Sequence, residues 1–196
     1  MQHSIPVPGP IDSTTGLVTG VRQVLSPHCD ERPAGVGPEL IVVHSISLPP
    51  GNFGGPWIEQ LFCGNLDPSA HPYFATIFAA RVSAHVLVRR NGGVIQFVPF
   101  GMRAWHAGAS SWCGRDACND YSIGIELEGA DDQPYEPVQY QRLSGLIGAL
   151  RIAYPALAVG RVVGHSDIAP GRKTDPGESF DWQRLRSLLA QAAVVP

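Results

Sequence analysis

The segment 164–177, GHSDIAPGRKTDPG, concentrates chemically active side chains in a stretch with few apolar residues. Near its two ends lie His165 and Asp175, ten positions apart. An imidazole and a carboxylate are both zinc ligands, and two ligands about 2.0–2.2 Å from one ion have donor atoms within about 4 Å of each other. Pro-Gly pairs at 170–171 and 176–177 supply turns that could bring the two ends together. The segment is therefore a candidate part of a metal site.

The same segment carries two cations between the candidate ligands, Arg172 and Lys173. In extended backbone, residues two apart point the same way, so Lys173 and Asp175 could face a common centre. The alternative is that these charges form a solvated surface turn with transient ion pairs, each worth about 0–1 kcal/mol. The segment by itself leaves both interpretations open.

Three histidines near apolar segments are candidates for a further ligand. His44 follows the apolar run Leu40–Val43, His85 lies in the run SAHVLV, and His106 follows Trp105. A single histidine beside an apolar strand is more often a hydrogen-bonded core residue than a metal ligand. Spacing along the chain does not choose among the three.

Two glutamates are candidates for a general base. The segment 121–129, YSIGIELEG, alternates between apolar residues at 123, 125 and 127 and the residues Gly124, Glu126 and Glu128. This alternation predicts a strand with one apolar face and with both glutamates on the other face. Periodicity does not say which glutamate takes part in chemistry.

The elements that must position these residues are strands and helices mixed along the chain. The apolar run Leu40–Val43 is typical of a central strand buried on both faces, and it stops at His44. The segment 83–100 predicts two strands joined by a tight turn at its Asn-Gly pair, and RVVGH predicts a short strand that ends at His165.

Two helices are predicted, one from about Val138 to Tyr154 and one from Trp182 to about Ala192. The first has an apolar stripe at positions 143, 146, 147, 150 and 154, with Pro137 in its first turn. The second follows Asp181, a residue type that caps helix N-termini. The segment 47–84 is rich in Pro, Gly and aromatic residues, so we expect it to pack over one edge of the sheet and to act as a mobile lid.

Length predicts a single domain, and the strands and helices mixed along the chain predict the mixed α/β (α+β) class. The chain has 196 residues, of which 44% are hydrophobic and 16% charged, and it is short for two domains. We expect residues 1–15 to be a flexible N-terminal segment and residues 16–196 to form the domain. We also expect a monomer.

Charge and hydropathy exclude several classes of partner. The net charge is −3, and no basic block interleaves with aromatic residues, so we expect no nucleic-acid partner. The first twenty residues lack an export signal and no stretch approaches a membrane span, so we expect a cytoplasmic protein without membrane insertion. Its four cysteines are then expected to be free thiols, and Cys113 and Cys118 lack the C-x2-C spacing of a structural zinc site.

Five segments, taken in order, resemble the zinc-dependent N-acetylmuramoyl-L-alanine amidases. They are IVVHSISLPPGNFGGPWIEQLF, RVSAHVLVRRNGGVIQFVPF, RAWHAG, NDYSIGIELEG and GHSDIAPGRKTDPGESFDW. The likeness covers about Gly16 to Leu185, and within the family the chain looks like the cytoplasmic AmpD type. The resemblance implies the fold shared with peptidoglycan-recognition proteins, in which helices flank a central mixed β-sheet. It also implies hydrolysis of the amide bond between 1,6-anhydro-N-acetylmuramic acid and the L-alanine of the stem peptide, in cell-wall muropeptide recycling.

The resemblance assigns the metal ligands and the catalytic residues. It implies that His44, His165 and Asp175 hold Zn²⁺ and leave the fourth tetrahedral position to water, the pattern of a catalytic site. Zinc held in this way can lower the pKa of its water to about 7. Glu126 matches the glutamate that accepts the proton of this water and passes it to the leaving amine. Lys173 matches the lysine that stabilises the oxyanion of the tetrahedral intermediate.

The resemblance also suggests residues that bind the substrate, a small anhydro-muropeptide. Trp105 resembles an aromatic residue on the sugar side of the groove, and Arg81 resembles a basic residue that faces the peptide carboxylates. The chain departs from the family where relatives usually have asparagine, at Ser45, and where they often have arginine, at Ala117, although Arg115 is nearby. These departures affect the expected grip on the substrate and leave the metal chemistry intact.

Two alternative functions follow from the same resemblance. Homologous peptidoglycan-recognition modules keep the fold and bind without hydrolysis, but such proteins typically lack a ligand that is present here. Other amidases of this fold act on intact peptidoglycan outside the cytoplasm, and the missing export signal counts against the envelope form of that alternative.

Overall fold

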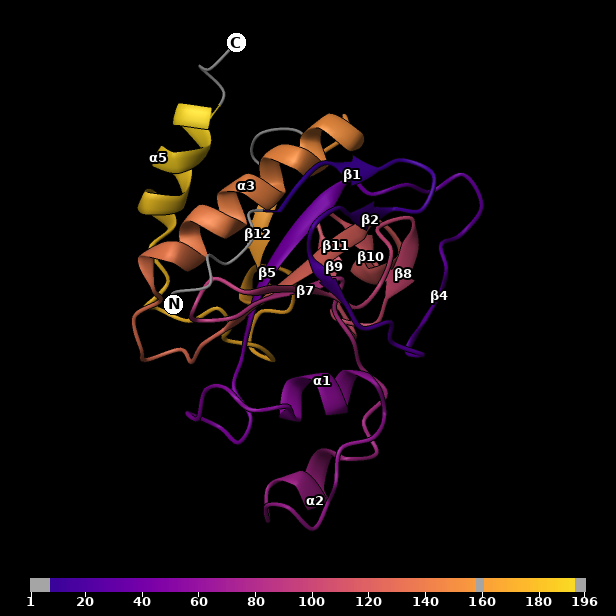
Figure 1. Cartoon of the computed structure of the whole chain (residues 1–196). Coiled ribbons are helices and arrows are strands. Elements are labelled where there is room, and N and C mark those ends of the chain that lie inside the picture. Colours follow the sequence, from indigo (N-terminus) through magenta and orange to yellow (C-terminus); the bar gives the residue numbers. More distant parts are fainter. Residues whose placement is uncertain (1–7, 158–160, 193–196) are drawn as a thin grey trace.

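A six-stranded sheet forms the centre of the protein (Figure 1). In the computed structural model, which describes residues 8–157 and 161–192, the strand order is β12-β5-β11-β6-β7-β3. Strands β12, β5, β11 and β6 are parallel, β7 runs antiparallel to β6, and β3 runs parallel to β7. The mixed sheet expected from the sequence is therefore confirmed. The strands are β3 (Arg22–Gln23), β5 (Leu40–Ile46), β6 (Val86–Val88), β7 (Val94–Gln96), β11 (Ser122–Glu128) and β12 (Val162–Gly164).

Short strand pairs and helices surround this sheet. The pairs are β1 (Ile11–Asp12) with β2 (Leu17–Val18), β4 (Cys29–Glu31) with β8 (Met102–Ala104), and β9 (Ser111–Trp112) with β10 (Arg115–Asp116). The helices are α1 (Trp57–Phe62), α2 (Phe74–Ile77), α3 (Pro137–Ala153), α4 (His165–Ile168) and α5 (Trp182–Ala192), with a 3-10 turn, η1, at Cys118–Asp120. Among the described helices, none has the length and apolar character needed to span a bilayer.

The N-terminal part of the described chain is held by backbone hydrogen bonds. Of the segment 1–15 that was expected to be flexible, residues 1–7 lie outside the described residues. Strand β1 pairs with β2, and the N–H group of Gly9 donates to the carbonyl of Thr19 at 2.9 Å. Residues 11 and 12 are thus paired, and the division of the chain at residue 15 stays a prediction.

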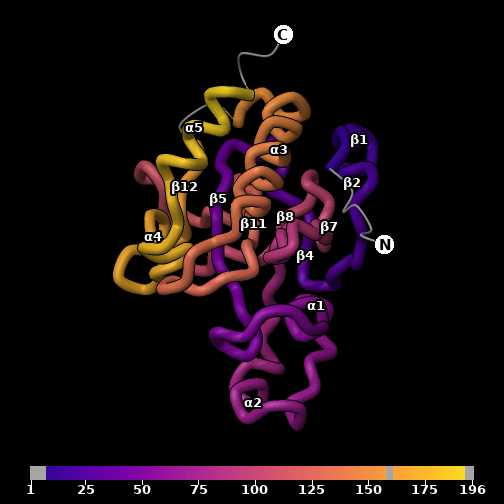
Figure 2. Tube along the Cα trace, turned by 60° about the vertical axis from the view of Figure 1, so that its left-hand side comes forward, coloured from indigo at the N-terminus to yellow at the C-terminus, as the bar shows by residue number. Residues whose placement is uncertain are grey.

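Helices α3 and α5 cover one face of the sheet (Figures 1 and 2). The predicted stripe of α3 is buried against alternate residues of β5 and β11, with Leu143 and Leu146 fully enclosed. Each such leucine stabilises the fold by about 1.5–3 kcal/mol. Helix α5 begins directly after Asp181, whose Oδ1 accepts a hydrogen bond from the N–H group of Arg184 at 2.8 Å. Both predicted helices are present at nearly the predicted boundaries.

The opposite face of the sheet changes from apolar to polar along the strands. At the start of β5, Leu40 and Val42 pack with Cys118, Tyr121 and Ile168 in an apolar cluster. Because successive side chains alternate between faces, the next residue of β5 on this face is His44. The polar site therefore lies toward the carboxyl end of the parallel strands, where α/β sheets commonly bind ligands.

The segment 47–84 forms a unit beyond the ends of the central strands (Figures 1 and 2). It contains α1 and α2, whose Trp57 and Phe74 rings lie 5.2 Å apart, and it shares an apolar cluster with Leu87 and Ile95 of β6 and β7. Its Glu59 also pairs with Arg22 of the edge strand β3 at 2.7 Å, which agrees with the expectation that the segment packs over one edge of the sheet. Its apolar residues cover the inner strands β6 and β7. Movement of this segment stays a prediction.

Strand β11 differs from the sequence expectation in one respect. Alternation predicted a single apolar face, but all seven residues of β11 are buried. The polar face is covered because the segments 47–84 and 105–121 close over it. Strand β5 also runs two residues past His44, and His165 begins α4 instead of ending β12.

Two further sequence expectations agree with the structure. The Asn-Gly turn joins β6 and β7, with Gly92 at φ 83°, a left-handed conformation that favours glycine. All four cysteines are free thiols.

Candidate metal centre and active site

Three neighbouring strands bring the proposed ligands and the proposed base together. In the parallel pairing of β5 with β11, His44 lies beside Glu126. On the other side of β5, Gly164 of β12 pairs with Val43, which puts His165 next to His44. Strand register therefore brings Glu126, His44 and His165 together although they are far apart along the chain.

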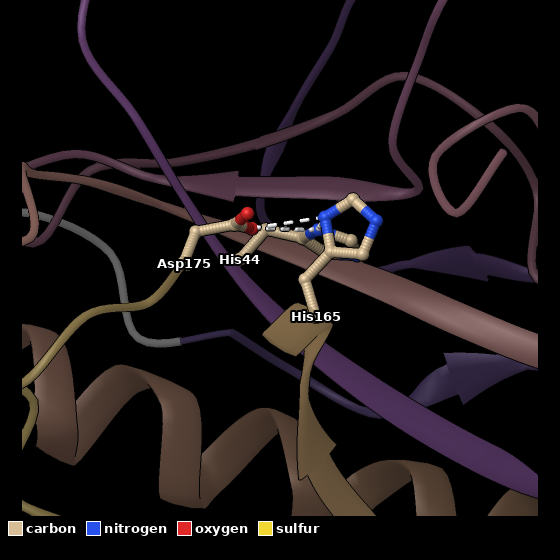
Figure 3. Close-up of side chains that lie close together, drawn as sticks. All are labelled: His44, His165 and Asp175. Carbon is tan, nitrogen blue, oxygen red and sulfur yellow. Dashed lines mark hydrogen bonds and ion pairs between the residues drawn. The ribbon is translucent and has the colours of Figure 1, made fainter. Parts of the chain in front are cut away.

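The side chains of His44, His165 and Asp175 point toward one another (Figure 3). The two Nδ1 atoms lie 2.9 Å apart, and Asp175 Oδ2 lies 3.2 Å from that of His44 and 3.1 Å from that of His165. One ligand atom from each residue lies within 4.8 Å of the others, which is close enough for a single metal ion. These are the three residues that the sequence resemblance assigned as ligands.

The segment 164–177 folds back on itself to deliver the carboxylate. The N–H group of Ser166 donates to the carbonyl of Asp175 at 3.0 Å, which ties the two ends of the loop together. Gly177 has φ 81°, and a Cβ atom there would lie 2.2 Å from Cα of Asp131. Glycine is therefore required for the last turn of this loop.

Two groups of the centre have protonation states that suit a cation. Burial lowers the pKa of His44 to about 4, so its ring is neutral at pH 7. The side chain of Asp175 is partly exposed, at 15%, and a carboxylate in such a position is ionised at pH 7. At pH 7 the centre therefore contains a neutral imidazole beside an ionised carboxylate.

The hydrogen bond behind His165 tests whether this ring can act as a ligand. Its Nε2 atom lies 3.2 Å from the carbonyl oxygen of Ala107, which can only accept a hydrogen bond. In the neutral form, the single ring proton is then on Nε2, and Nδ1 presents a lone pair toward Asp175. A lone pair and a carboxylate oxygen that face each other at 3.1 Å fit a metal ion held between them.

Glu126 lies beside this centre without a fixed partner. It is buried at 9% exposure, and its enclosed Oε2 atom has no hydrogen-bond partner within the described part of the chain. Burial and the negative charge of Asp175 raise the pKa of Glu126 well above its usual value, although the charge of Lys173 opposes the shift. A divalent cation at the centre would favour the ionised form by Coulombic attraction. The carboxyl group is thus suited to accept and release a proton.

Glu128, the other candidate, has a structural role. Its Oε1 accepts hydrogen bonds from Arg89 at 2.9 Å and from the N–H group of Gly54 at 2.7 Å, and its Oε2 accepts one from the N–H group of Arg90 at 3.2 Å. Its lone pairs are therefore engaged in joining β11 to the β6–β7 turn and to the segment 47–84. These partners favour Glu126 over Glu128 for a role in chemistry, a choice that periodicity left open.

An open groove with a volume of about 800 Å³ runs past the centre. It is lined by the three proposed ligands, by Glu126 and by Lys173, whose side chain is exposed. The other cation of the loop, Arg172, donates to the carbonyls of Ala107 and Ala109 at 2.6 Å. The loop charges are thus not a simple solvated turn, because Arg172 is bound to the chain and Lys173 faces the groove.

The three residues expected to grip the substrate take different positions. Ser45 and Trp105 line the groove, and Ser45 donates a hydrogen bond to Asp131 at 3.4 Å. The indole N–H group of Trp105 donates to Asp30 at 3.0 Å, which fixes the plane of the ring. The guanidinium of Arg81 lies 5.4 Å from the centroid of the Trp105 ring, so it stands beside the groove wall.

The two remaining candidate histidines lie behind the centre. His106 Nδ1 is 2.9 Å from His44 Nε2, and His85 Nδ1 accepts a hydrogen bond from the N–H group of Gly124 at 3.0 Å. Burial is the main reason that the pKa of His106 is well below its usual value and that of His85 is about 3, so both rings are neutral at pH 7. Sequence spacing could not separate these histidines from His44, because their positions depend on the packing of three separate segments.

A centre of two histidines and one carboxylate, with an adjacent glutamate in an open groove, is the arrangement of a metal-dependent hydrolase. The family model described as N-acetylmuramoyl-L-alanine amidase matches residues 34–178. The match includes every proposed ligand and both candidate glutamates. The chain belongs to the N-acetylmuramoyl-L-alanine amidase family.

Particular relatives are similar to the chain over nearly its whole length. The 1,6-anhydro-N-acetylmuramyl-L-alanine amidase AmpD of Citrobacter freundii is 57% identical over 178 residues, which are 91% of this chain and 95% of the relative. A crystal structure of a selenomethionine AmpD derivative has a TM-score of 0.87 and 58% identity, and covers 89% of this chain and 97% of that chain.

A solved complex is a more distant relative. It contains the N-acetylmuramyl-L-alanine amidase AmiD of Escherichia coli with the substrate anhydro-N-acetylmuramic acid-L-Ala-D-γ-Glu-L-Lys. Its TM-score is 0.57 at 33% identity, and the match covers 81% of this chain and 60% of that chain.

Proposed function

We propose that this protein hydrolyses the amide bond between 1,6-anhydro-N-acetylmuramic acid and the L-alanine of the stem peptide, and so acts in muropeptide recycling. The observation that carries the proposal is the convergence of two imidazoles and a carboxylate beside a buried glutamate with no partner on Oε2. The names and coverage of the AmpD relatives support the choice of substrate. A substrate of this kind is present in the AmiD complex.

His44, His165 and Asp175 would hold Zn²⁺, since their donor atoms suit that ion and form the three-ligand set of a catalytic site. When bound, the ion supplies a Lewis acid for the scissile carbonyl and lowers the pKa of a water molecule. The protein's part is to keep the three donor atoms in place before the ion arrives. The loop tie between Ser166 and Asp175 and the strand register at His44 do this.

Glu126 is the proton carrier of the proposed reaction. Its carboxylate takes a proton from the attacking water and delivers it to the nitrogen of the departing L-alanine, so the amide bond breaks without an amide anion leaving. The lack of a partner on Oε2 leaves this atom available for both transfers. Glu128, two residues further along β11, could not carry the proton in this way, because three donors hold its carboxylate.

Lys173 stabilises the negative charge that develops on the carbonyl oxygen as water adds. Its ammonium group is exposed and lines the groove on the loop that carries Asp175. That both residues line the same groove supports this proposed role.

Trp105, Arg81 and Ser45 are the proposed contacts for the rest of the substrate. The flat indole face of Trp105 suits the apolar C–H surface of a sugar ring, and its hydrogen bond to Asp30 keeps the face in one orientation. Arg81, which stands next to this ring, suits a peptide carboxylate through a bidentate contact. Ser45 and its partner Asp131 add a polar wall to the groove.

The experiment that tests the proposal is digestion of an anhydro-muropeptide beside intact peptidoglycan, with and without a metal chelator, with products read by mass spectrometry. We expect release of the free stem peptide from the anhydro-muropeptide, and loss of this release with the chelator. Binding without cleavage would support the recognition module instead. Preferential cleavage of intact peptidoglycan would support the amidase that acts outside the cytoplasm. The monomeric state and the cytoplasmic location stay predictions.

A further inference from the structure

The ring of His106 lies directly behind His44, on the side away from the other two proposed ligands. The Nδ1 atom of His106 is 2.9 Å from Nε2 of His44, and the two rings are almost perpendicular at 86° with centroids 5.0 Å apart. His106 is buried at 9% exposure. Because His44 directs its Nδ1 at His165 and Asp175, the contact with His106 is made through its other nitrogen.

The direction of this hydrogen bond is set by a chain of atoms that ends at a backbone carbonyl. The Oγ atom of Ser122 lies 2.5 Å from the carbonyl oxygen of Cys118, which can only accept, so the hydroxyl of Ser122 is the donor. The same hydroxyl lies 3.1 Å from Nε2 of His106. Since its one proton is used, it accepts from His106, whose single ring proton is then on Nε2.

The chain of donors continues to the metal centre. With its proton on Nε2, His106 has a lone pair on Nδ1 and accepts from the Nε2–H group of His44. The neutral ring of His44 therefore has no proton on Nδ1. With His165 in the neutral tautomer favoured by the carbonyl of Ala107, three lone-pair donors, one each from His44, His165 and Asp175, face one another at separations of 2.9, 3.1 and 3.2 Å.

The ring of His106 fits a slot that the sequence of β11 provides. A Cβ atom on Gly124 would lie 2.4 Å from Cγ of His106, so only glycine admits the ring at this position. The backbone N–H groups of His106 and Ala107 both donate to Oδ1 of Asn119, at 3.1 Å and 2.8 Å. The ring is thus held by its backbone, by the glycine slot and by hydrogen bonds at both of its nitrogens.

We propose that His106, oriented by Ser122, is a positioning residue that fixes the tautomer and the ring orientation of His44 for metal binding. This inference rests on the proposed metal site and adds a partner behind it. A metal-ligating histidine usually donates its second N–H to a carbonyl or a carboxylate, and loss of such a partner costs about 10–100-fold in metal affinity. Here the acceptor is Nδ1 of a second imidazole, that of His106. This atom has a lone pair because the Ser122 hydroxyl donates to the carbonyl of Cys118 and accepts from Nε2 of His106.

The test measures the affinity of the metal-free protein for Zn²⁺ by competition with a chromophoric chelator. His106→Phe fills the slot without an acceptor, and His106→Asn keeps an amide oxygen near the position of Nδ1. We expect one zinc per chain throughout, an affinity about 10–100-fold lower for His106→Phe, and a partial recovery for His106→Asn. Ser122→Ala, which frees the tautomer of His106, should weaken binding less than His106→Phe. The buried Ser144→Ala on α3 is the matched control and should bind as wild type does.

Two further measurements separate positioning from a purely structural role. The unfolding midpoint of each metal-free variant reports structure alone, and loss of zinc affinity beyond the loss of stability supports positioning. Long-range ¹H–¹⁵N spectra of the metal-free wild type report which nitrogen of His44 carries the proton, and we expect Nε2. A proton on Nδ1, or wild-type zinc affinity in His106→Phe, would overturn the inference. If His106→Phe fails to fold, Ser122→Ala and the wild-type spectra still decide.

The proposed metal site can fail separately from this inference. Unchanged zinc affinity in His165→Ala would refute the assigned ligand set. The spectra of the metal-free protein would still show whether His106 sets the tautomer of His44.

Discussion

Replacing each of the two buried glutamates of β11 by glutamine separates catalysis from stability. Glu126 and Glu128 are two residues apart on the same face of one strand, and both are buried. Glutamine keeps the size of the side chain and removes the charge and the proton carrier. The structure predicts opposite consequences for the two positions.

For Glu128→Gln the expected effect is on folding. The substitution weakens the contact with Arg89 and sets an amide against the N–H donors of Gly54 and Arg90. Breaking a buried ion pair costs about 3–5 kcal/mol when it strands the partner's charge. Arg89 keeps a second partner, Glu59, at 3.0 Å, so we expect a loss of about 2–3 kcal/mol in the free energy of unfolding.

For Glu126→Gln the expected effect is on turnover. Its Oε2 has no hydrogen-bond partner to lose, and burial already disfavours its charged form, so the free energy of unfolding should stay within about 1 kcal/mol of wild type. Removing a general acid–base group typically lowers the rate by about 10²–10⁴-fold, equivalent to about 3–5 kcal/mol of activation free energy.

The assays are urea unfolding of the metal-free proteins and hydrolysis of an anhydro-muropeptide at saturating zinc. Chelation in the first assay keeps metal binding out of the stability measurement. Wild-type turnover in Glu126→Gln would refute the assigned proton carrier. A Glu128→Gln protein that is as stable as wild type but inactive would show that the two roles had been exchanged.

Four further outcomes are expected. His165→Ala should lose both zinc and activity, and full zinc occupancy in this variant would contradict the ligand assignment. In wild type, the unfolding free energy without zinc should be about 2.7 kcal/mol lower than at a free zinc concentration of a hundred times the dissociation constant. Burial lowers the pKa of His85 to about 3, whereas the pKa in the unfolded chain is near 6.5. The unfolding free energy should therefore not depend on this ring above pH 6.5, and should fall by about 1.4 kcal/mol for each pH unit between pH 6.5 and pH 3. Urea unfolding at decreasing pH measures this loss, and an NMR titration of the ring near pH 6 would contradict it. Gly177→Ala places a side chain at a φ of 81°, with its Cβ 2.2 Å from Cα of Asp131. The unfolding free energy should therefore fall by about 1–3 kcal/mol, and zinc affinity should weaken. Unchanged values in both assays would show that the last turn of the 164–177 loop does not require glycine. Trp105→Ala should raise KM for the anhydro-muropeptide without loss of zinc, and an unchanged KM would remove this residue from the substrate contacts.

Much of the fold could be predicted because local sequence and tertiary structure agree in those elements. The uninterrupted apolar run of β5, the Asn-Gly turn of the β6–β7 hairpin and the stripe of α3 behind Pro137 each favour one structure on their own. The assignment of β11 to a one-sided strand failed because burial of its polar face depends on two distant segments, 47–84 and 105–121. Alternation reports the chemistry of a face and not what covers it.

The residue types of the proposed site could be predicted from the sequence, and the resemblance to a known family named the individual residues. Spacing along the chain did not identify them. Spacing did not choose among His44, His85 and His106, since the choice depends on the pairing of β12 with β5 and of β5 with β11. The role of Ser122 was missed altogether. A serine in a strand does not by itself indicate a functional role. The proposed role of Ser122 depends on its hydrogen bonds with the carbonyl of Cys118 and the ring of His106, which sequence does not reveal.

By itself the sequence determined the strands and helices, the turns at glycine, and the supply of imidazole and carboxylate groups, because these depend on residues that are near each other in the chain. The tertiary structure alone decided which side chains converge at the proposed centre, which groups face each ring nitrogen, and which of the two glutamates has an Oε2 atom without a hydrogen bond among the described residues. Those properties depend on atoms within about 3 Å that belong to segments far apart in the chain, and only the packed fold brings them together.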